Sequence, residues 1–201
     1  NPAKIQCLSH FWSFAQGYSS DNKGADFLKT PTLETERIIL RPLTIADAKE
    51  AFENWTHDDR VTKYMRYNSH NTVNDTKDWL KTEEDSLLSD KQYSWGFVEK
   101  ENGSLFGSGG LVYNEDQKMF EIGYNIMYDY WHQGYTTEIA GALIDFVKNT
   151  LQEKQLYGCH AVENIYSGKV MEKHGFEPTG YCIVKNFDGT TKRAKSYLLK
   201  F

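Results

Sequence analysis

The sequence predicts a single mixed α/β domain in which helices flank a mostly antiparallel sheet. Short apolar runs alternate with helical patterns, and two pairs of these runs are separated by turn residues that favour hairpins. The 39% hydrophobic content of the 201 residues is ordinary for a globular protein. The simplest division is one domain over residues 33–201, preceded by an extension over residues 1–32 to which we assign no role.

The first half of the domain predicts a strand, two helices and a hairpin. The run ERIILRPL predicts the strand, because Ile38 and Leu40 alternate with the residues between them. A helix is expected from Thr44 to about Asn54, and a second from about Asn74 to Leu88. The runs YSWGFVEK and SLFGSGGLVY flank an Asn-Gly pair, which favours a hairpin because both residues tolerate positive φ.

The second half continues as strand, helix, strand, helix and hairpin. Strands are expected at about 119–127 and 157–162, and helices from residue 136 and over about 165–174. The closing hairpin pairs YCIVKNF with KSYLLKF across Asp188-Gly189. The order of elements implies a sheet that is antiparallel at both ends and interrupted by β-α-β connections.

One segment, from Gly123 to Val147, changes from a strand into a loop at Gly134 and then into a helix. The apolar residues of that helix recur at the spacing of a buried face. A helix that begins after a glycine loop directs unpaired N–H groups and the positive end of its dipole at one point. The sequence therefore predicts a phosphate site there.

Composition excludes several classes of partner. The net charge is −5 and no basic stretch stands out, so nucleic acid is not expected. No run reaches the ~18 apolar residues that a membrane span requires. Three widely separated cysteines, Cys7, Cys159 and Cys182, are typical of reduced thiols in a cytoplasmic protein. The six histidines lack ligand spacing, so we expect no metal site.

The stretch from Asn164 to Phe176 has two interpretations that spacing alone does not separate. Asn164 can cap a short helix, and Gly175 can end it while Phe176 packs back on Met171. Alternatively, this helix lies beside the phosphate site, and three of its polar residues face the same ligand. Those residues are Asn164, Ser167 and Lys173.

Four segments together resemble the GCN5-related N-acetyltransferase (GNAT) family. They are ETERIILRPLTIADA, NGSLFGSGGL, FEIGYNIMYDYWHQGYTTEIA and NIYSGKVMEKHGF. The resemblance covers residues 33–201 and is greatest with the branch of ribosomal-protein-alanine N-acetyltransferases. It implies a sheet splayed into a V, acetyl-CoA as the co-substrate, and a monomer or a homodimer. Several independent motifs in the right order make the match specific.

The resemblance also assigns cofactor-binding positions in this chain. The pantetheine arm would pair with the backbone of Ile126 and Met127, beside Asn164, Ser167 and Lys173. The pyrophosphate would lie on the loop and the helix start, which are His132, Gln133, Gly134, Tyr135, Thr136 and Thr137. This placement agrees with the phosphate site predicted from the residues alone.

Acetyl transfer to an amine needs a neutral nucleophile, an oxyanion donor and a leaving group that becomes protonated. We expect Glu121 to act as the base through water, or else to be a cross-strand or surface carboxylate. The backbone N–H of Met127 is the expected oxyanion donor. Many relatives have a tyrosine acid where this chain has Met171, so the donor role passes to Ser167 or to Tyr166.

The expected activity is therefore acetyl transfer from acetyl-CoA to a primary amine by direct attack in a ternary complex. The resemblance favours a protein N-terminus as acceptor. A small-molecule amine, such as a polyamine, an amino acid or an aminoglycoside, is the alternative, as is a non-catalytic acyl-CoA-binding sensor. A dinucleotide-dependent oxidoreductase is rejected, because the loop has one glycine rather than Gly-x-Gly-x-x-Gly.

Overall fold

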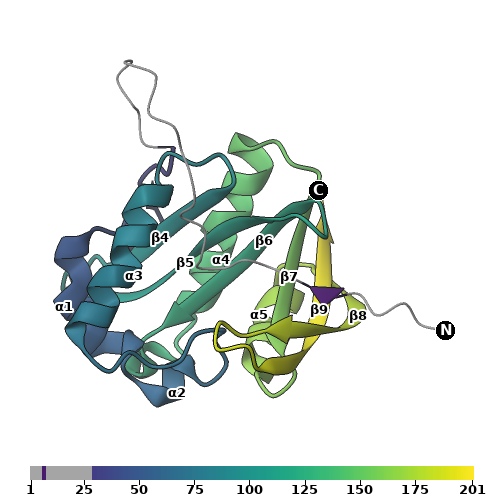
Figure 1. The fold of residues 1–201 in the computed structure, drawn as a ribbon. Coiled ribbons are helices and arrows are strands. Elements are labelled where there is room, and N and C mark those ends of the chain that lie inside the picture. The colour runs from purple at the N-terminus through teal and green to yellow at the C-terminus, as the bar shows by residue number, and fades with distance from the viewer. Residues whose placement is uncertain (1–5, 8–28) are drawn as a thin grey trace, which may run out of the picture.

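The computed structural model describes residues 6–7 and 29–201, and its centre is one sheet of nine described strands (Figure 1). The strands lie in the order β1-β8-β9-β7-β6-β5-β4-β3-β2. Their bounds are β1 Gln6–Cys7, β2 Leu33–Glu34, β3 Ile38–Arg41, β4 Gln92–Glu99, β5 Leu105–Asn114, β6 Met119–Ile126, β7 Gln155–Ala161, β8 Glu177–Lys185 and β9 Thr191–Lys200.

Neighbouring strands are antiparallel except in the pairs β1–β8 and β6–β7. The β6–β7 pair is short, since it joins only Glu121 to Tyr157 and Ile122 to Gly158. Beyond these pairs, β6 runs on to Ile126 and β7 runs on to Ala161 without pairing with each other. The sheet is thus two antiparallel blocks that diverge from a short seam, and the predicted fold class is confirmed.

Helices cover both faces of the sheet (Figure 1). The principal helices are α1 Ala48–Ala51, α2 Asp59–Thr62, α3 Val73–Ser86, α4 Tyr135–Asp145 and α5 Ile165–Lys173. Strand alternation separates two cores: Trp95 and Phe97 pack on the α4 face, whereas Val98 packs with Leu80 of α3 on the other. None of the described helices has the length and apolar character needed to cross a bilayer.

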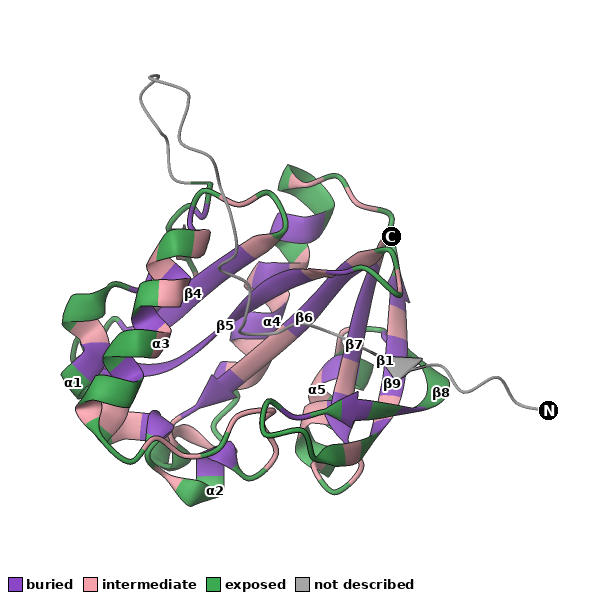
Figure 2. Cartoon of the chain, in the orientation of Figure 1, coloured by how far each residue is buried: buried purple, intermediate pink, exposed green. Residues whose placement is uncertain are grey.

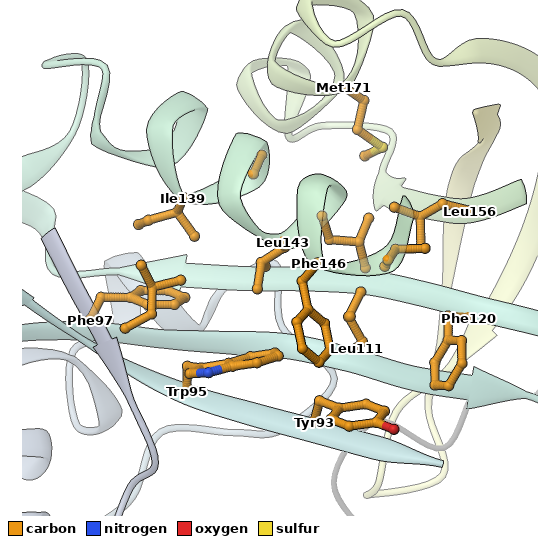
Figure 3. Close-up of a cluster of buried hydrophobic side chains, with 14 of the residues drawn as sticks. Tyr93, Trp95, Phe97, Leu111, Phe120, Ile139, Leu143, Phe146, Leu156 and Met171 are labelled. Atoms are coloured by element: carbon orange, nitrogen blue, oxygen red, sulfur yellow. The ribbon is translucent and has the colours of Figure 1, made fainter. Parts of the chain in front are cut away.

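The main core lies between α4 and the sheet (Figure 3). Ile139 and Leu143 of α4 are fully buried, and Phe146 stands edge-on to Trp95 with ring centroids 5.3 Å apart. Strand β5 is buried along almost its whole length (Figure 2). A Cβ on its Gly109 would approach the carbonyl oxygen of Gly123 to 2.4 Å, so the glycine is what lets β5 and β6 pair closely.

The structure departs from the predicted elements in several details. The helix expected from residue 44 to 54 is composite: a 3₁₀ turn Ile45–Asp47, then α1, then a π-helical turn Phe52–Thr56. The four-residue α2 is too short to give a periodic signal. At the first hairpin only Gly103 has positive φ, because the Asn102 side chain bridges Glu99 and Ser104 instead.

The chain before residue 33 already contacts the fold where it is described. Strand β1 pairs with Ile183 and Val184 of β8, and the carbonyl oxygen of Pro31 accepts a hydrogen bond from Trp95 Nε1 at 2.6 Å. Most of the expected extension lies outside the described residues. The domain boundary at residue 33 therefore stays a prediction.

Candidate active site

The loop between β6 and α4 has the backbone conformation of an anion site. His132 and Gly134 adopt left-handed φ values of +61° and +84°, and both are exposed. Gly134 caps α4 without a side-chain hydrogen bond, and the first α-helical bond runs from Glu138 N to the Gly134 carbonyl. The three N–H groups before Glu138 therefore precede the helical ladder and have no acceptor within it. This backbone conformation suits the predicted phosphate site, which stays a prediction.

Side chains behind the loop hold it in place. The Tyr135 hydroxyl is buried and donates to Glu99, as does the Tyr130 hydroxyl at 2.5 Å. These bonds, that of Tyr130 first, hold the pKa of Glu99 below its usual range, and the bond to Glu99 raises the pKa of Tyr135 to about 12. Tyr135 is thus a supporting residue that offers a ligand only its backbone N–H.

Arg37 joins the start of β3 to the same loop. Its Nε donates to Glu138 at 2.7 Å, and its Nη1 donates to the Gln133 carbonyl at 3.2 Å. Its guanidinium also lies 4.0 Å from the Tyr135 ring centre. Sequence reasoning missed this residue, because nothing local links position 37 to position 138. The arrangement fixes the loop and adds a cation next to the anion site.

A cavity of about 110 Å³ lies where β6 and β7 diverge. Its walls come from β5, β6, β7, α5, the β8–β9 hairpin and the segment 64–66. The lining side chains with polar groups are Tyr64, Arg66, Glu121, Tyr124, Asn125, Cys159, His160, Asn164, Ser167, Asn186 and Lys192. The seam of the sheet and this cavity therefore coincide.

Glu121 lies inside the cavity wall, 4% exposed. Its carboxylate accepts hydrogen bonds from Asn114 Nδ2 at 2.8 Å and from Cys159 Sγ at 3.2 Å. The surface-carboxylate interpretation is therefore wrong. These two bonds fix the carboxylate in the wall of the cavity.

Helix α5 contributes Asn164 and Ser167 to the same cavity. Its C-terminus is the predicted one: Gly175 has a φ of +82°, and Phe176 N donates to the Met171 carbonyl at 3.1 Å. Asn164 is the N-cap residue of α5, as predicted, but its side chain makes no capping hydrogen bond.

Lys173 and Tyr166 do not join the other α5 residues in the cavity. Lys173 is exposed and stands about 240° around the helix from Ser167, so the structure separates it from the ligand-facing side. Tyr166 is 54% exposed, and its ring packs on His132 at 4.5 Å between centroids. This contact places the start of α5 beside the anion loop.

Tyr124 is a further residue of the cavity wall. Burial raises the pKa of its hydroxyl to about 12, and the Ser167 hydroxyl offsets part of this effect. The two oxygens do not form a hydrogen bond of regular geometry, and the Tyr124 oxygen has no partner among the described residues. Its position on an alternating strand gave no signal that the hydroxyl faces a cavity.

The oxyanion donor predicted at Met127 needs correction. The Met127 N–H donates to the Phe106 carbonyl oxygen at 2.6 Å and is part of the β5–β6 ladder. Because backbone groups alternate in direction along a strand, the N–H of Ile126 points to the opposite side, where β7 has diverged. The Ile126 carbonyl is itself taken by Trp131 Nε1 at 3.0 Å, which leaves the N–H as the group for a ligand.

No metal site accompanies this cavity in the described part of the chain. Residues 6–7 and 29–201 contain no group of three His, Cys, Asp or Glu side chains that could hold an ion.

Known proteins share this fold and these sequence patterns. A model of the acetyltransferase (GNAT) domain matches residues 37–177. The uncharacterized N-acetyltransferase p20 of Bacillus licheniformis is 27% identical over 150 residues, which cover 74% of this chain and 84% of that protein. The uncharacterized N-acetyltransferase YoaA of Bacillus subtilis is 24% identical over 75% of this chain and 85% of its own length.

Solved structures show the same arrangement of elements. A GNAT-family acetyltransferase from Bacillus anthracis superposes with a TM-score of 0.71 at 21% identity, covering 85% of this chain and 98% of that one. A Vibrio cholerae protein provisionally described as a ribosomal-protein-serine acetyltransferase gives 0.73 at 19% identity, covering 87% and 100%. With the family model matching most of the chain, this protein belongs to the GNAT family of acetyltransferases.

Proposed function

We propose that the protein transfers the acetyl group of acetyl-CoA to a primary amine by direct attack in a ternary complex. The observation that carries this proposal is the meeting of three features at one seam. They are the anion loop at the start of α4, the diverging strands β6 and β7, and a cavity that contains a buried carboxylate. The anion loop suits the pyrophosphate and the diverging strands suit the pantetheine arm. The cavity suits the thioester and the amine that react.

The anion loop is proposed to bind the pyrophosphate through backbone N–H groups from Gly134 to Thr137. His132 and Gln133 are exposed beside it, and Arg37 supplies the nearby positive charge. Tyr135 contributes its N–H alone, since its phenol is engaged with Glu99. The loop orients the co-substrate so that its thioester reaches the cavity at the seam.

Glu121 is the proposed base. An α-amino group with a pKa of about 7.7 to 8.0 is mostly protonated at neutral pH, and it cannot attack a thioester until it loses that proton. A buried carboxylate in the cavity wall can accept the proton directly or through a water molecule. For a lysine-type amine, with a pKa of about 10.4, the need is greater.

Two hydroxyls are proposed to serve the departing thiolate. Tyr124 stays neutral at pH 7, because its pKa is about 12, and its unpartnered hydroxyl can donate a proton or a hydrogen bond to the sulfur. Ser167 stands beside it and can relay that proton. The N–H of Ile126 replaces that of Met127 as the proposed donor to the tetrahedral oxyanion.

The proposed acceptor is a protein or peptide N-terminus, with a small-molecule amine as the alternative. The resemblance to ribosomal-protein N-acetyltransferases supports the first, as does the description of the Vibrio cholerae neighbour. A cytoplasmic location, and a monomer or homodimer as the oligomeric state, are also proposed from the sequence.

The test is release of free CoA from acetyl-CoA over a panel of peptides and small amines. Glu121→Gln should lower kcat at pH 7 by about 10²-fold or more, with partial recovery at high pH, where the amine is already neutral. Tyr124→Phe and Ser167→Ala should lower kcat less. Glu115→Gln is the matched control, because this exposed carboxylate pairs with Lys91 away from the cavity.

Two results would contradict the proposal in different ways. Near-normal kcat/KM across the pH range for both Glu121→Gln and Ser167→Ala would remove these residues from the mechanism. Binding of acetyl-CoA without turnover on any amine would identify the protein as a sensor rather than an enzyme.

A further inference from the structure

Two buried amide side chains face the cavity with oxygen atoms that lack partners. Asn125 on β6 and Asn186, directly after β8, are each 7% exposed, and both line the cavity. Neither Oδ1 atom has a hydrogen-bond partner among the described residues. Buried amide oxygens are almost always paired, so these two are available to accept hydrogen bonds from the donor groups of a ligand or from water.

The orientation of Asn186 follows from its neighbours. The Thr190 hydroxyl donates its single proton to Asp188 Oδ1 at 2.6 Å, so toward Asn186 it can only accept. The Asn186 group 2.9 Å from Thr190 Oγ1 must therefore be the NH₂. Consequently the oxygen of Asn186, rather than the nitrogen, is the atom left without a partner.

The amide of Asn125 is also oriented with its oxygen unpartnered, although only one hydrogen bond fixes it. Its Nδ2 donates to the hydroxyl of Ser108 at 3.3 Å, and Ser108 is fully buried. With Glu121 on the same strand, the cavity carries two amide oxygens and a carboxylate, all of which accept hydrogen bonds. A ligand that fits these atoms must present several N–H donors on a small head group.

We infer that Asn125 and Asn186 bind the amino group of the acceptor through their amide oxygens. The inference rests on the proposed function. A primary amine offers two or three N–H donors, enough to satisfy both amide oxygens, and its proton is proposed to reach Glu121 through water. A tertiary amine offers none of these when neutral, and a secondary amine has one fewer.

Lys192 opposes a positive charge on the bound amine, whereas the carboxylate of Glu121 attracts one. Lys192 also lines the cavity, and its ammonium donates to the carbonyl oxygens of Lys63 at 2.9 Å and Met65 at 2.6 Å. A second positive charge beside it would be repelled, whereas a neutral amine would not. At about 110 Å³ the cavity admits the amino end of an acceptor and leaves the rest outside.

The test compares substitutions of Asn186 that keep or remove the oxygen. Asn186→Leu should raise KM for the amine about ten-fold or more, with KM for acetyl-CoA unchanged, because a buried polar contact to the acceptor is lost. Asn186→Asp keeps an acceptor oxygen and should restore much of the affinity. Asn68→Leu is the control, an exposed amide that contacts the same turn through Asp188.

Thr190→Val tests the orientation argument without changing Asn186. Loss of the hydroxyl frees the amide to rotate, so KM for the amine should rise while the melting temperature reports folding. Peptides with free N-termini and unbranched alkylamines are assayed separately, so that the two classes of acceptor can be compared. Their N-methyl analogues, which have one N–H fewer, should be poorer acceptors.

The outcomes separate this inference from the proposed function. Turnover by the wild type with an unchanged KM for the amine in Asn186→Leu and Thr190→Val overturns the inference alone. Equal use of primary and N-methyl acceptors also overturns it. Binding of acetyl-CoA by the wild type with no turnover on any amine overturns both.

Discussion

Gly134 and Gly141 show how position within one helix decides what a glycine does. Gly134 begins α4 with a φ of +84°, in the left-handed region, although a Cβ there would meet nothing closer than an Arg37 nitrogen at 3.6 Å. Gly141 lies in the middle of the same helix, where a Cβ would touch the His174 ring at 3.4 Å, an ordinary contact. The first is constrained by its backbone, and the second only by helix propensity.

We expect opposite effects from alanine at these two positions. Gly134→Ala should lower the free energy of unfolding by about 1 kcal/mol, because a Cβ strains the left-handed conformation, and should raise KM for acetyl-CoA. Gly141→Ala should raise stability by about 0.5–1 kcal/mol without changing that KM. Urea unfolding and initial rates measure both quantities. A Gly134→Ala variant with normal affinity for acetyl-CoA would contradict the role of the loop.

At this scale the sequence located residues but not orientations. Glu121 and Ser167 line the cavity and Gly134 begins α4, while the roles assigned to them stay predictions. Asn186 and Arg37 were missed, since their partners are set by tertiary contacts far along the chain or by the hairpin turn. The Met127 N–H was misassigned because the direction of an N–H depends on the strand register, which a motif does not contain.

At the scale of elements, the contact between α3 and β4 contains an unusual buried acid. Glu83 of α3 is 1% exposed, and burial raises its pKa to about 8, although hydrogen bonds from Ser94, Trp79 and Gln92 act in the opposite direction. In the unfolded chain this carboxyl has a pKa near 4.5. Ionisation of Glu83 therefore opposes folding, since the charged form is better solvated in the unfolded state.

This acid makes the stability of the α3–β4 contact depend on pH. Its folded-state pKa is raised, so the cost is absent below about pH 4.5, grows as pH rises toward 8, and is constant above that. Glu83→Gln should therefore be close to wild type at pH 5 and more stable by on the order of 2 kcal/mol at pH 8.5. Urea unfolding at the two pH values measures this. Asp85→Asn, at an exposed position on the same helix, is the control, and an equal effect of Glu83→Gln at both pH values would contradict the expectation.

Strands and the longer helices were predictable because their periodicity is local. The burial alternation of β3 and the apolar face of α4 follow the sequence pattern directly. The composite helix at 45–56 and the short α2 were not predictable from the sequence, since both are shaped by packing on β5 and by the Asp58 cap. The hairpin at Gly103 was found with the wrong turn chemistry, because the Asn102 side chain competes for the backbone.

For the whole molecule, the decisive feature is the short parallel pairing of β6 and β7. The resemblance predicted the splayed sheet, and the topology confirms it, yet neither the walls of the cavity nor its polar lining follow from strand order. Those walls come from six separate parts of the chain, including the segment 64–66. A cavity assembled from so many elements is a property of tertiary structure alone.

Binding of CoA at this seam should stabilise the entire fold. If CoA binds only the folded protein, a free concentration of 100 times Kd adds about 2.7 kcal/mol to the free energy of unfolding. Thermal melts across a CoA titration should show a continuous rise in Tm, and the rise should be smaller for Gly134→Ala at the same concentrations. Adenosine, which lacks the pyrophosphate, is the matched ligand control. An unchanged Tm at millimolar CoA would contradict the proposed site.

The short seam also gives the molecule a modular construction. Among the described strands, the two antiparallel blocks are joined by the residue pairs Glu121–Tyr157 and Ile122–Gly158 alone. Insertions or altered turn lengths in the β8–β9 hairpin can therefore reshape one wall of the cavity without shifting the strands that lead to the anion loop. Such a scaffold permits acceptor preference to diversify, or to be engineered by hairpin exchange, while the handling of the acetyl donor is left intact.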